Sequence, residues 1–166
     1  MRFHVEQRFG VPADAVMAAF ADPAFYPELA KLPNVGEPEV IDRTQDGDTV
    51  RMQVRYRFTG DLSAAARRVL DPHKLTWIDH ATIDLAARRT VFELRADHYA
   101  DRFRCHGAYA LDDIEGGASR RVVDGELTVR APLVGKAVER AILSGLERHL
   151  DDEVDVVERW VGTNGR

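Results

Sequence analysis

The strongest constraint on the fold lies near the end of the chain, in residues 132–161. Apolar side chains recur there at helical spacing, and no proline interrupts the pattern after Pro132. The segment predicts one amphipathic helix of about 30 residues. An apolar stripe of that length must be buried against another layer of structure, so the rest of the chain has to supply that layer.

The partner layer is predicted by segments in which apolar and polar residues alternate, the pattern of a half-buried strand. The clearest segment is 50–58, where arginine and glutamine alternate with apolar and aromatic residues; the others are 2–9, 37–43, 74–84, 89–96, 102–112 and 121–130. Asp46 and Gly47 favour a tight hairpin before 50–58. Consecutive strands joined by hairpins form an antiparallel sheet. The prediction is an α+β fold, with a curved sheet of six to seven strands wrapped around the C-terminal helix.

Two short helices are predicted after the first strand. Gly10 ends that strand, and Pro12 suits the first turn of a helix over residues 12–22. Asp22 stands where an N-cap is expected, before a second short helix opened by Pro23.

Residues 61–73 form the most irregular stretch between the predicted strands. Ser63 is placed to cap a short helical turn, and Asp71 with Pro72 ends it. Two interpretations stay open, a surface excursion and a lid over the mouth of a binding site.

Length and composition bound the class of protein. The 166 residues fit one domain, which we expect to span 1–162, with 163–166 as a frayed tail. A net charge of -5 argues against a nucleic-acid binder, and no apolar run approaches the ~20 residues that membrane insertion requires. The single cysteine fits a reducing, cytoplasmic location. We expect a monomer or homodimer.

Two motifs carry a resemblance to a known superfamily. The segment VPADAVMAAFADPAFYPEL, residues 11–29, resembles the two short helices of the START-like, helix-grip (SRPBCC, polyketide cyclase-like) superfamily. The segment RVVDGELTVRAPLVGKAVERAI, residues 121–142, resembles the last strand and helix entry of an actinobacterial branch known only as a domain of unknown function. The resemblance covers nearly the whole chain. It implies a helix-grip fold that encloses a hydrophobic cavity between sheet and helix, and it brings no catalytic motif.

Side chains alternate between the two faces of a strand, and this period of two residues decides where the adjacent residues Asp79 and His80 point. Trp77, Asp79 and Ala81 share the more apolar face of segment 74–84, whereas His80 lies on the other face. Asp79 therefore points toward the helix and His80 points to solvent. The two cannot form an acid-base pair on a regular strand.

The same sorting, applied to the other strands and the helix, predicts an apolar and aromatic lining with a few polar groups. This mixture suits a small hydrophobic ligand held by one or two polar anchors. A core filled by its own side chains is the alternative. The expected ligand-binding residues are Gln7, Tyr56, Phe58, Trp77, Asp79, Phe92, Cys105, Tyr109, Ile142, Gly145, Leu146 and His149.

His149 lies in the middle of the apolar stripe of the predicted helix, one turn after Gly145. The plain interpretation is a histidine in the core whose ring is hydrogen-bonded within the protein. The functional one is a polar group that binds a ligand or Asp79, with its ring oriented by Glu153 four residues on. A desolvated Asp79 is expected to have a raised pKa unless a cation offsets it. The catalytic residues stay unknown, with Asp79 and His149 as candidates.

Other chemistries find little support in the sequence. No pair of histidines or cysteine has zinc-site spacing, no base is predicted beside Cys105, and no glycine-rich phosphate loop follows a strand. We expect no metal and no cofactor.

Three functions remain open. The first is binding or carriage of a small hydrophobic, lipid- or polyketide-like molecule. The second is an enzyme of the aromatase or cyclase type, which would use acid-base residues of the cavity. The third is an interaction module that works through the outer face of the sheet, as the resemblance implies, since the superfamily also includes chaperone cofactors.

Overall fold

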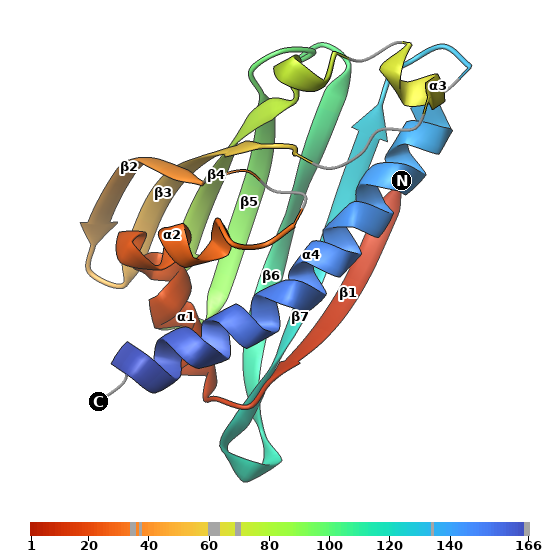
Figure 1. Cartoon of the computed structure of the whole chain (residues 1–166). Helices are drawn as coiled ribbons and strands as arrows, with labels where there is room; N and C mark the ends of the chain where they lie inside the picture. Colours follow the sequence, from red (N-terminus) through yellow and green to blue (C-terminus); the bar gives the residue numbers. More distant parts are fainter. Residues whose placement is uncertain (34–35, 37, 60–63, 69–70, 134, 165–166) are drawn as a thin grey trace.

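The structure is a computed structural model that describes residues 1–33, 36, 38–59, 64–68, 71–133 and 135–164. A curved sheet lies behind one long helix, and two short helices cover one end of the sheet (Figure 1). The elements run in the order β1 Arg2–Phe9, α1 Ala13–Ala21, η1 Pro23–Phe25, α2 Tyr26–Leu29, β2 Glu39–Asp46, β3 Thr49–Arg57, α3 Ala64–Arg67, η2 Pro72–Lys74, β4 Thr76–Asp84, β5 Arg89–Ala96, β6 Phe103–Ile114, η3 Glu115–Gly117, β7 Ala118–Val129 and α4 Gly135–Asn164.

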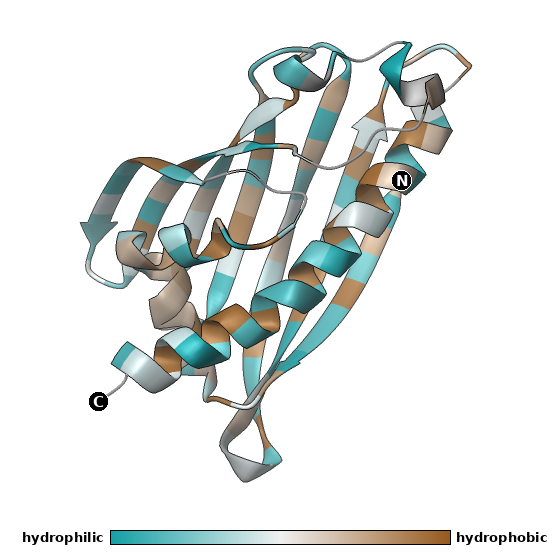
Figure 2. Cartoon of the chain, viewed as in Figure 1, coloured by the Kyte–Doolittle hydropathy of each residue, from teal (hydrophilic) through white to brown (hydrophobic). Residues whose placement is uncertain are grey.

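The seven strands form one antiparallel sheet in the order β1-β7-β6-β5-β4-β3-β2. Hydrophilic and hydrophobic bands alternate along the strands (Figure 2), so apolar and polar side chains point to opposite faces. The apolar face is the one toward α4, since strand residues such as Phe3 and Leu127 cluster with Leu143 of the helix. We call this the inner face and the opposite one the outer face. The predicted α+β, helix-grip architecture is confirmed.

The predicted helix starts after β1 are confirmed. Pro12 directly precedes α1, and the side chain of Asp22 accepts a hydrogen bond of 2.9 Å from the backbone N–H of Ala24 at the start of η1. The ring of Phe25, which is fully buried, meets the ring of Trp160 in α4 at 5.8 Å. The two short helices are therefore sealed against the C-terminal half of α4.

Two apolar clusters hold the layers together. One joins α1, η1 and α2 to β3 and to the end of α4, and the other joins β1, β6 and β7 to the first half of α4. Within the second cluster, the ring of Phe3 lies over Gly125, where an added Cβ would stand 2.3 Å from the ring. Phe92 covers Gly107 in the same way at 2.7 Å. These glycines let aromatic rings lie flat on the inner face.

The long helix differs from its prediction at both ends. It begins at Gly135 and continues to Asn164, because Thr163 and Asn164 donate side-chain hydrogen bonds to the carbonyls of Arg159 and Trp160. Residues 163 and 164, expected in a frayed tail, therefore lie in the helix.

Ile142, expected among the ligand-binding residues on the buried side of the helix, does not lie there. Its side chain is 37% exposed, and the centre of the buried side is taken by Leu143, Leu150 and Val157. The physical reason is that α4 packs mainly on β1, β7, α1 and α2 instead of on the middle of the sheet, which rotates its buried face. Of the helices in the described ranges, none combines the length and the apolar character needed to cross a membrane.

Residues 60–63, 69 and 70 lie outside the described part of the chain. The predicted cap at Ser63 and part of the proposed lid over 61–73 fall on them. Residues 64–67 form the short helix α3.

Candidate functional site

Strand β4 presents Asp79 and His80 to opposite faces, as predicted. Asp79 stands opposite Val54 and Leu94, and His80 stands opposite Gln53 and Glu93 on the outer face. Two residues before Asp79 on the same face, Trp77 stacks on Tyr56 of β3, with ring centroids 5.9 Å apart and planes 17° from parallel. Asp79 and His80 do not form a catalytic pair.

The Asp79 carboxyl lies deep between the layers. Its Oδ1 atom is buried and has no hydrogen-bond partner. Burial, and secondly the negative charge of Glu153, raise the pKa of Asp79 to about 7. The expected rise in pKa is therefore present, and a substantial fraction of this carboxyl is protonated at neutral pH.

Arg121 of β7 is a buried cation that the sequence reasoning missed. Its Nε donates to Gln7 Oε1 at 2.6 Å, and its Nη2 donates to Glu153 Oε2 at 2.6 Å. The guanidinium also lies over three aromatic rings at 4.8–5.4 Å, those of Phe9, Phe20 and Tyr109. The signal that identifies Arg121 is its position on β7, since Arg121, Val123 and Leu127 all face inward at period 2.

Glu153 connects Arg121 to His149. Burial alone would raise the pKa of Glu153, but the charge of Arg121 and the bond from His149 hold it at about 2. His149 Nε2 lies 3.4 Å from Glu153 Oε1, so the predicted orientation of the ring by Glu153 is present. An ionised carboxylate only accepts hydrogen bonds, so Glu153 favours a proton on the Nε2 side of the ring. The other ring nitrogen, Nδ1, is buried without a partner.

Gln7, predicted to bind the ligand, is instead bonded within this network. Its Oε1 accepts from Arg121, and its Nε2 donates to the backbone carbonyl of Leu150 in α4. With both ends of its amide engaged, Gln7 ties β1 and β7 to the helix.

The other predicted residues surround Asp79 and His149 with different degrees of burial. Cys105 is buried, and desolvation raises the pKa of its thiol to about 12, as expected of a small core residue. A Cβ added at Gly145 would meet no atom within 4 Å, so open space lies next to the helix there. The partly exposed residues are Tyr56, Phe58, Trp77, Asp79, Phe92, Tyr109, Gly145, Leu146 and His149. We call these residues together the inner site.

A further hollow, where no ligand cavity was predicted, has a volume of about 860 Å³ and crosses β4, β5 and β6. Its lining combines outer-face residues, among them His80 and Glu93, with Phe92, Leu94 and Cys105 of the inner face. We call it the outer hollow.

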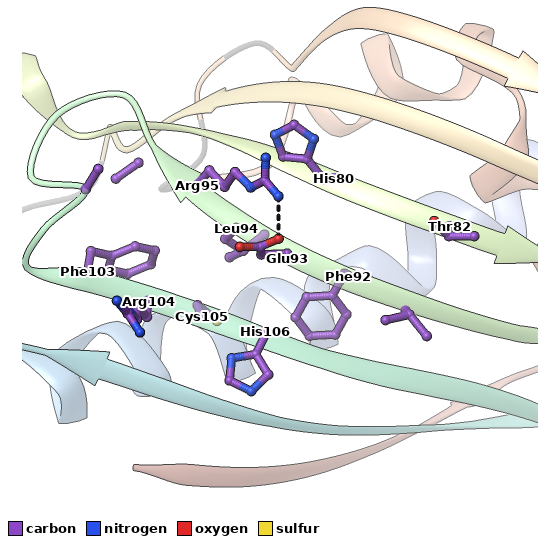
Figure 3. A pocket seen from close by; sticks show the side chains of 13 residues that line it. His80, Thr82, Phe92, Glu93, Leu94, Arg95, Phe103, Arg104, Cys105 and His106 are labelled. Atoms are coloured by element: carbon purple, nitrogen blue, oxygen red, sulfur yellow. Dashed lines mark hydrogen bonds and ion pairs between the residues drawn. The ribbon is translucent and has the colours of Figure 1, made fainter.

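Figure 3 shows the ion pair between Glu93 and Arg95 of β5, with His80 and His106 on the strands to either side. All four residues lie on the outer face. This is the face that an interaction module would use.

Comparisons with solved structures show the fold. TTHA0849 from Thermus thermophilus has a TM-score of 0.71 and 16% identity, and the match covers 100% of each chain. The Zhui aromatase/cyclase from a Streptomyces species has a TM-score of 0.67 and 17% identity, over 100% of this chain and 97% of that one. Norcoclaurine synthase from Thalictrum flavum has a TM-score of 0.64 and 16% identity, over 97% and 86% of the two chains.

Comparisons by sequence were made with curated proteins and with protein families. A search of the curated proteins found no match. A family described as Protein of unknown function (DUF2505) matches residues 4–161, nearly the whole sequence, and the chain therefore belongs to that family.

Proposed function

We propose that this protein binds and carries a small, largely apolar molecule in the inner site. One observation carries the proposal. Asp79 Oδ1 on the sheet and His149 Nδ1 on the helix are both buried without hydrogen-bond partners. Native proteins satisfy the great majority of buried polar atoms, and an unsatisfied one leaves a cost of about 1–3 kcal/mol. A ligand that bonds to these atoms would remove that cost.

The surroundings of the two atoms support an apolar body for the ligand. Trp77 and Tyr56 form a stacked aromatic wall beside Asp79, and Leu146 lies one turn before His149. All of these side chains stay partly exposed, whereas Phe25 and Val16 at the sealed end are fully buried. A site with aromatic walls and few polar groups is the usual composition of a small-molecule pocket.

Acid-base catalysis is the second candidate, and the pKa of Asp79 favours it. A carboxyl with a pKa of about 7 both takes up and releases protons at neutral pH, as a general acid or base must. The names of two structural neighbours, an aromatase/cyclase and a synthase, agree with chemistry on this fold. Carrier and enzyme differ in whether the bound molecule leaves unchanged.

Native mass spectrometry of the purified protein, before and after organic extraction, tests the proposal. We expect an added mass that extraction removes and that Asp79→Asn or His149→Ala reduces, while both variants keep the circular dichroism spectrum of the wild type. Recovery of the molecule in altered form after incubation would favour the enzyme. Equal retention in the wild type and in both variants would contradict this assignment of the site.

A further inference from the structure

The charges of the inner site leave Asp79 without a cation. Arg121 is engaged by Glu153 and Gln7, each at 2.6 Å. Among the described residues, the ion pairs do not include Asp79. The nearest charge that affects its carboxyl is that of Glu153, which has the same sign. The inner site therefore contains a buried acid whose ionised form lacks a counter-charge.

Among the described residues three buried side-chain atoms lack a partner, and two of them, Asp79 Oδ1 and His149 Nδ1, share a hydrogen-bonding character; the third is Thr90 Oγ1. His149 Nε2 lies 3.4 Å from Glu153 Oε1, and an uncharged ring that directs its proton there presents Nδ1 as an acceptor of hydrogen bonds. Asp79 accepts when it is ionised. A ligand that matches both atoms supplies N–H or O–H donors, and a carbonyl or carboxylate ligand does not match an ionised Asp79.

The elements packed around Asp79 offer aromatic rings and no free cation in the described part of the chain. Ring faces attract cations because of their quadrupole, and most strongly when the site is partly desolvated. The groups that face this region are Val54 and Tyr56 of β3, Trp77 of β4, Leu94 of β5, Cys105 and Tyr109 of β6, Tyr26 of α2, and His149 and Glu153 of α4.

We propose that the ligand is an amine, an apolar molecule whose protonated amino group binds the Asp79 carboxylate beside the rings of Trp77 and Tyr56. The proposal rests on the proposed function and deepens it by naming the chemical class of the ligand. A protonated amine supplies both the missing counter-charge and the missing donors. A neutral alcohol of the same shape supplies only a donor.

A matched pair of probes, naphthylmethylamine and naphthylmethanol, tests this class by isothermal titration calorimetry. At about pH 8 we expect the amine to bind the wild type ~10-fold or more tightly than the alcohol, because a charge-assisted bond is stronger than a neutral one. Asp79→Asn should remove the preference and leave alcohol binding within about threefold. Asp46→Asn, which removes an exposed carboxylate at the far end of β2, should keep the preference.

The pH dependence in the wild type gives a second measurement that needs no folded variant. Amine affinity should fall as the pH drops below about 7, since Asp79 then becomes neutral. Alcohol affinity should not fall. The same profile in His149→Gln assigns the effect to Asp79.

The outcomes separate this inference from the proposed function. Equal binding of amine and alcohol, or a preference that survives in Asp79→Asn, would overturn the amine proposal while the inner site stands as a binding site. Failure of both probes, together with no extractable mass on the purified protein, would overturn both proposals.

Discussion

Arg121 shows at the scale of one residue how the inner site is held together. Its guanidinium is almost fully buried, 2% exposed, and it bonds to β1 through Gln7 and to α4 through Glu153. Because a buried ion pair repays its desolvation only when both partners are present, the loss of one partner leaves the other as an isolated buried charge.

We therefore predict that Arg121→Met lowers the free energy of unfolding by roughly 3–5 kcal/mol. The double variant Arg121→Met with Glu153→Leu should recover most of that loss, since no charge is left unpaired. Arg95→Met, which breaks the exposed pair with Glu93, is the control and should leave the urea midpoint unchanged. A double variant no more stable than Arg121→Met would contradict this account of the ion pair.

Asp79 should make stability fall as the pH rises through the neutral range. Its folded pKa of about 7 lies above the ordinary value of 3.8, so the folded state binds a proton that the unfolded chain releases between these values. Without ligand, stability should decrease by ~2–4 kcal/mol across this interval. Asp79→Asn should remove the slope and exceed the wild type in stability at about pH 8. Urea unfolding at a series of pH values measures this pH dependence of stability. An unchanged slope in Asp79→Asn would refute its assignment to Asp79.

Glu153 acts in the opposite direction and in a lower pH range. Its pKa is held at about 2, below the ordinary value of 4.5, so its contribution to stability is complete above 4.5 and is lost as the pH falls toward 2. The two carboxyls together place maximal stability of the ligand-free protein on the acid side of neutral.

At the scale of elements, α4 combines a close contact on one side with open space on another. Leu143 and Leu150 pack on β1 and β7, whereas Gly145 faces space in which a Cβ meets no atom within 4 Å. A mid-helix glycine weakens a helix by ~1 kcal/mol relative to alanine. Its place beside His149 indicates that room next to the helix is kept at the expense of stability.

We predict that Gly145→Ala raises the free energy of unfolding by up to ~1 kcal/mol. Gly125→Ala is the matched control on the sheet, and it should destabilise the protein because the new Cβ would stand 2.3 Å from the ring of Phe3. Thermal melts of the two variants measure both effects. A loss of stability in Gly145→Ala would show that the space beside the helix is filled.

The strands and the helix differ in how well the sequence predicts side-chain direction. On a strand, period 2 allows only two faces, so placing Trp77 inward also fixes the directions of Asp79 and His80. On a helix, the buried face depends on where the helix lies across the sheet. For this reason Leu143 replaces Ile142 at the centre of the α4 interface. The same period-2 argument places Arg121 on the inner face, although it was not among the predicted residues.

At the scale of the whole molecule, the protein is sealed at one end and less tightly packed in the middle. The cluster around Phe25 and Trp160 closes the end formed by α1, α2 and the C-terminus of α4. Between this cluster and the one around Leu127 lie Arg121, Glu153, His149 and Asp79. The sequence predicted these layers from the order of the elements. It could not predict the unsatisfied atoms or the outer hollow, because both depend on the curvature of the sheet and the tilt of α4.

A crystal structure of the protein grown with naphthylmethylamine tests the central claim most directly, because it locates the ligand. The account predicts a molecule between β4 and α4, its nitrogen within hydrogen-bond distance of Asp79 and its rings against Trp77 and Tyr56. A molecule bound in the outer hollow beside Glu93, with the inner site closed by its own side chains, would contradict the account.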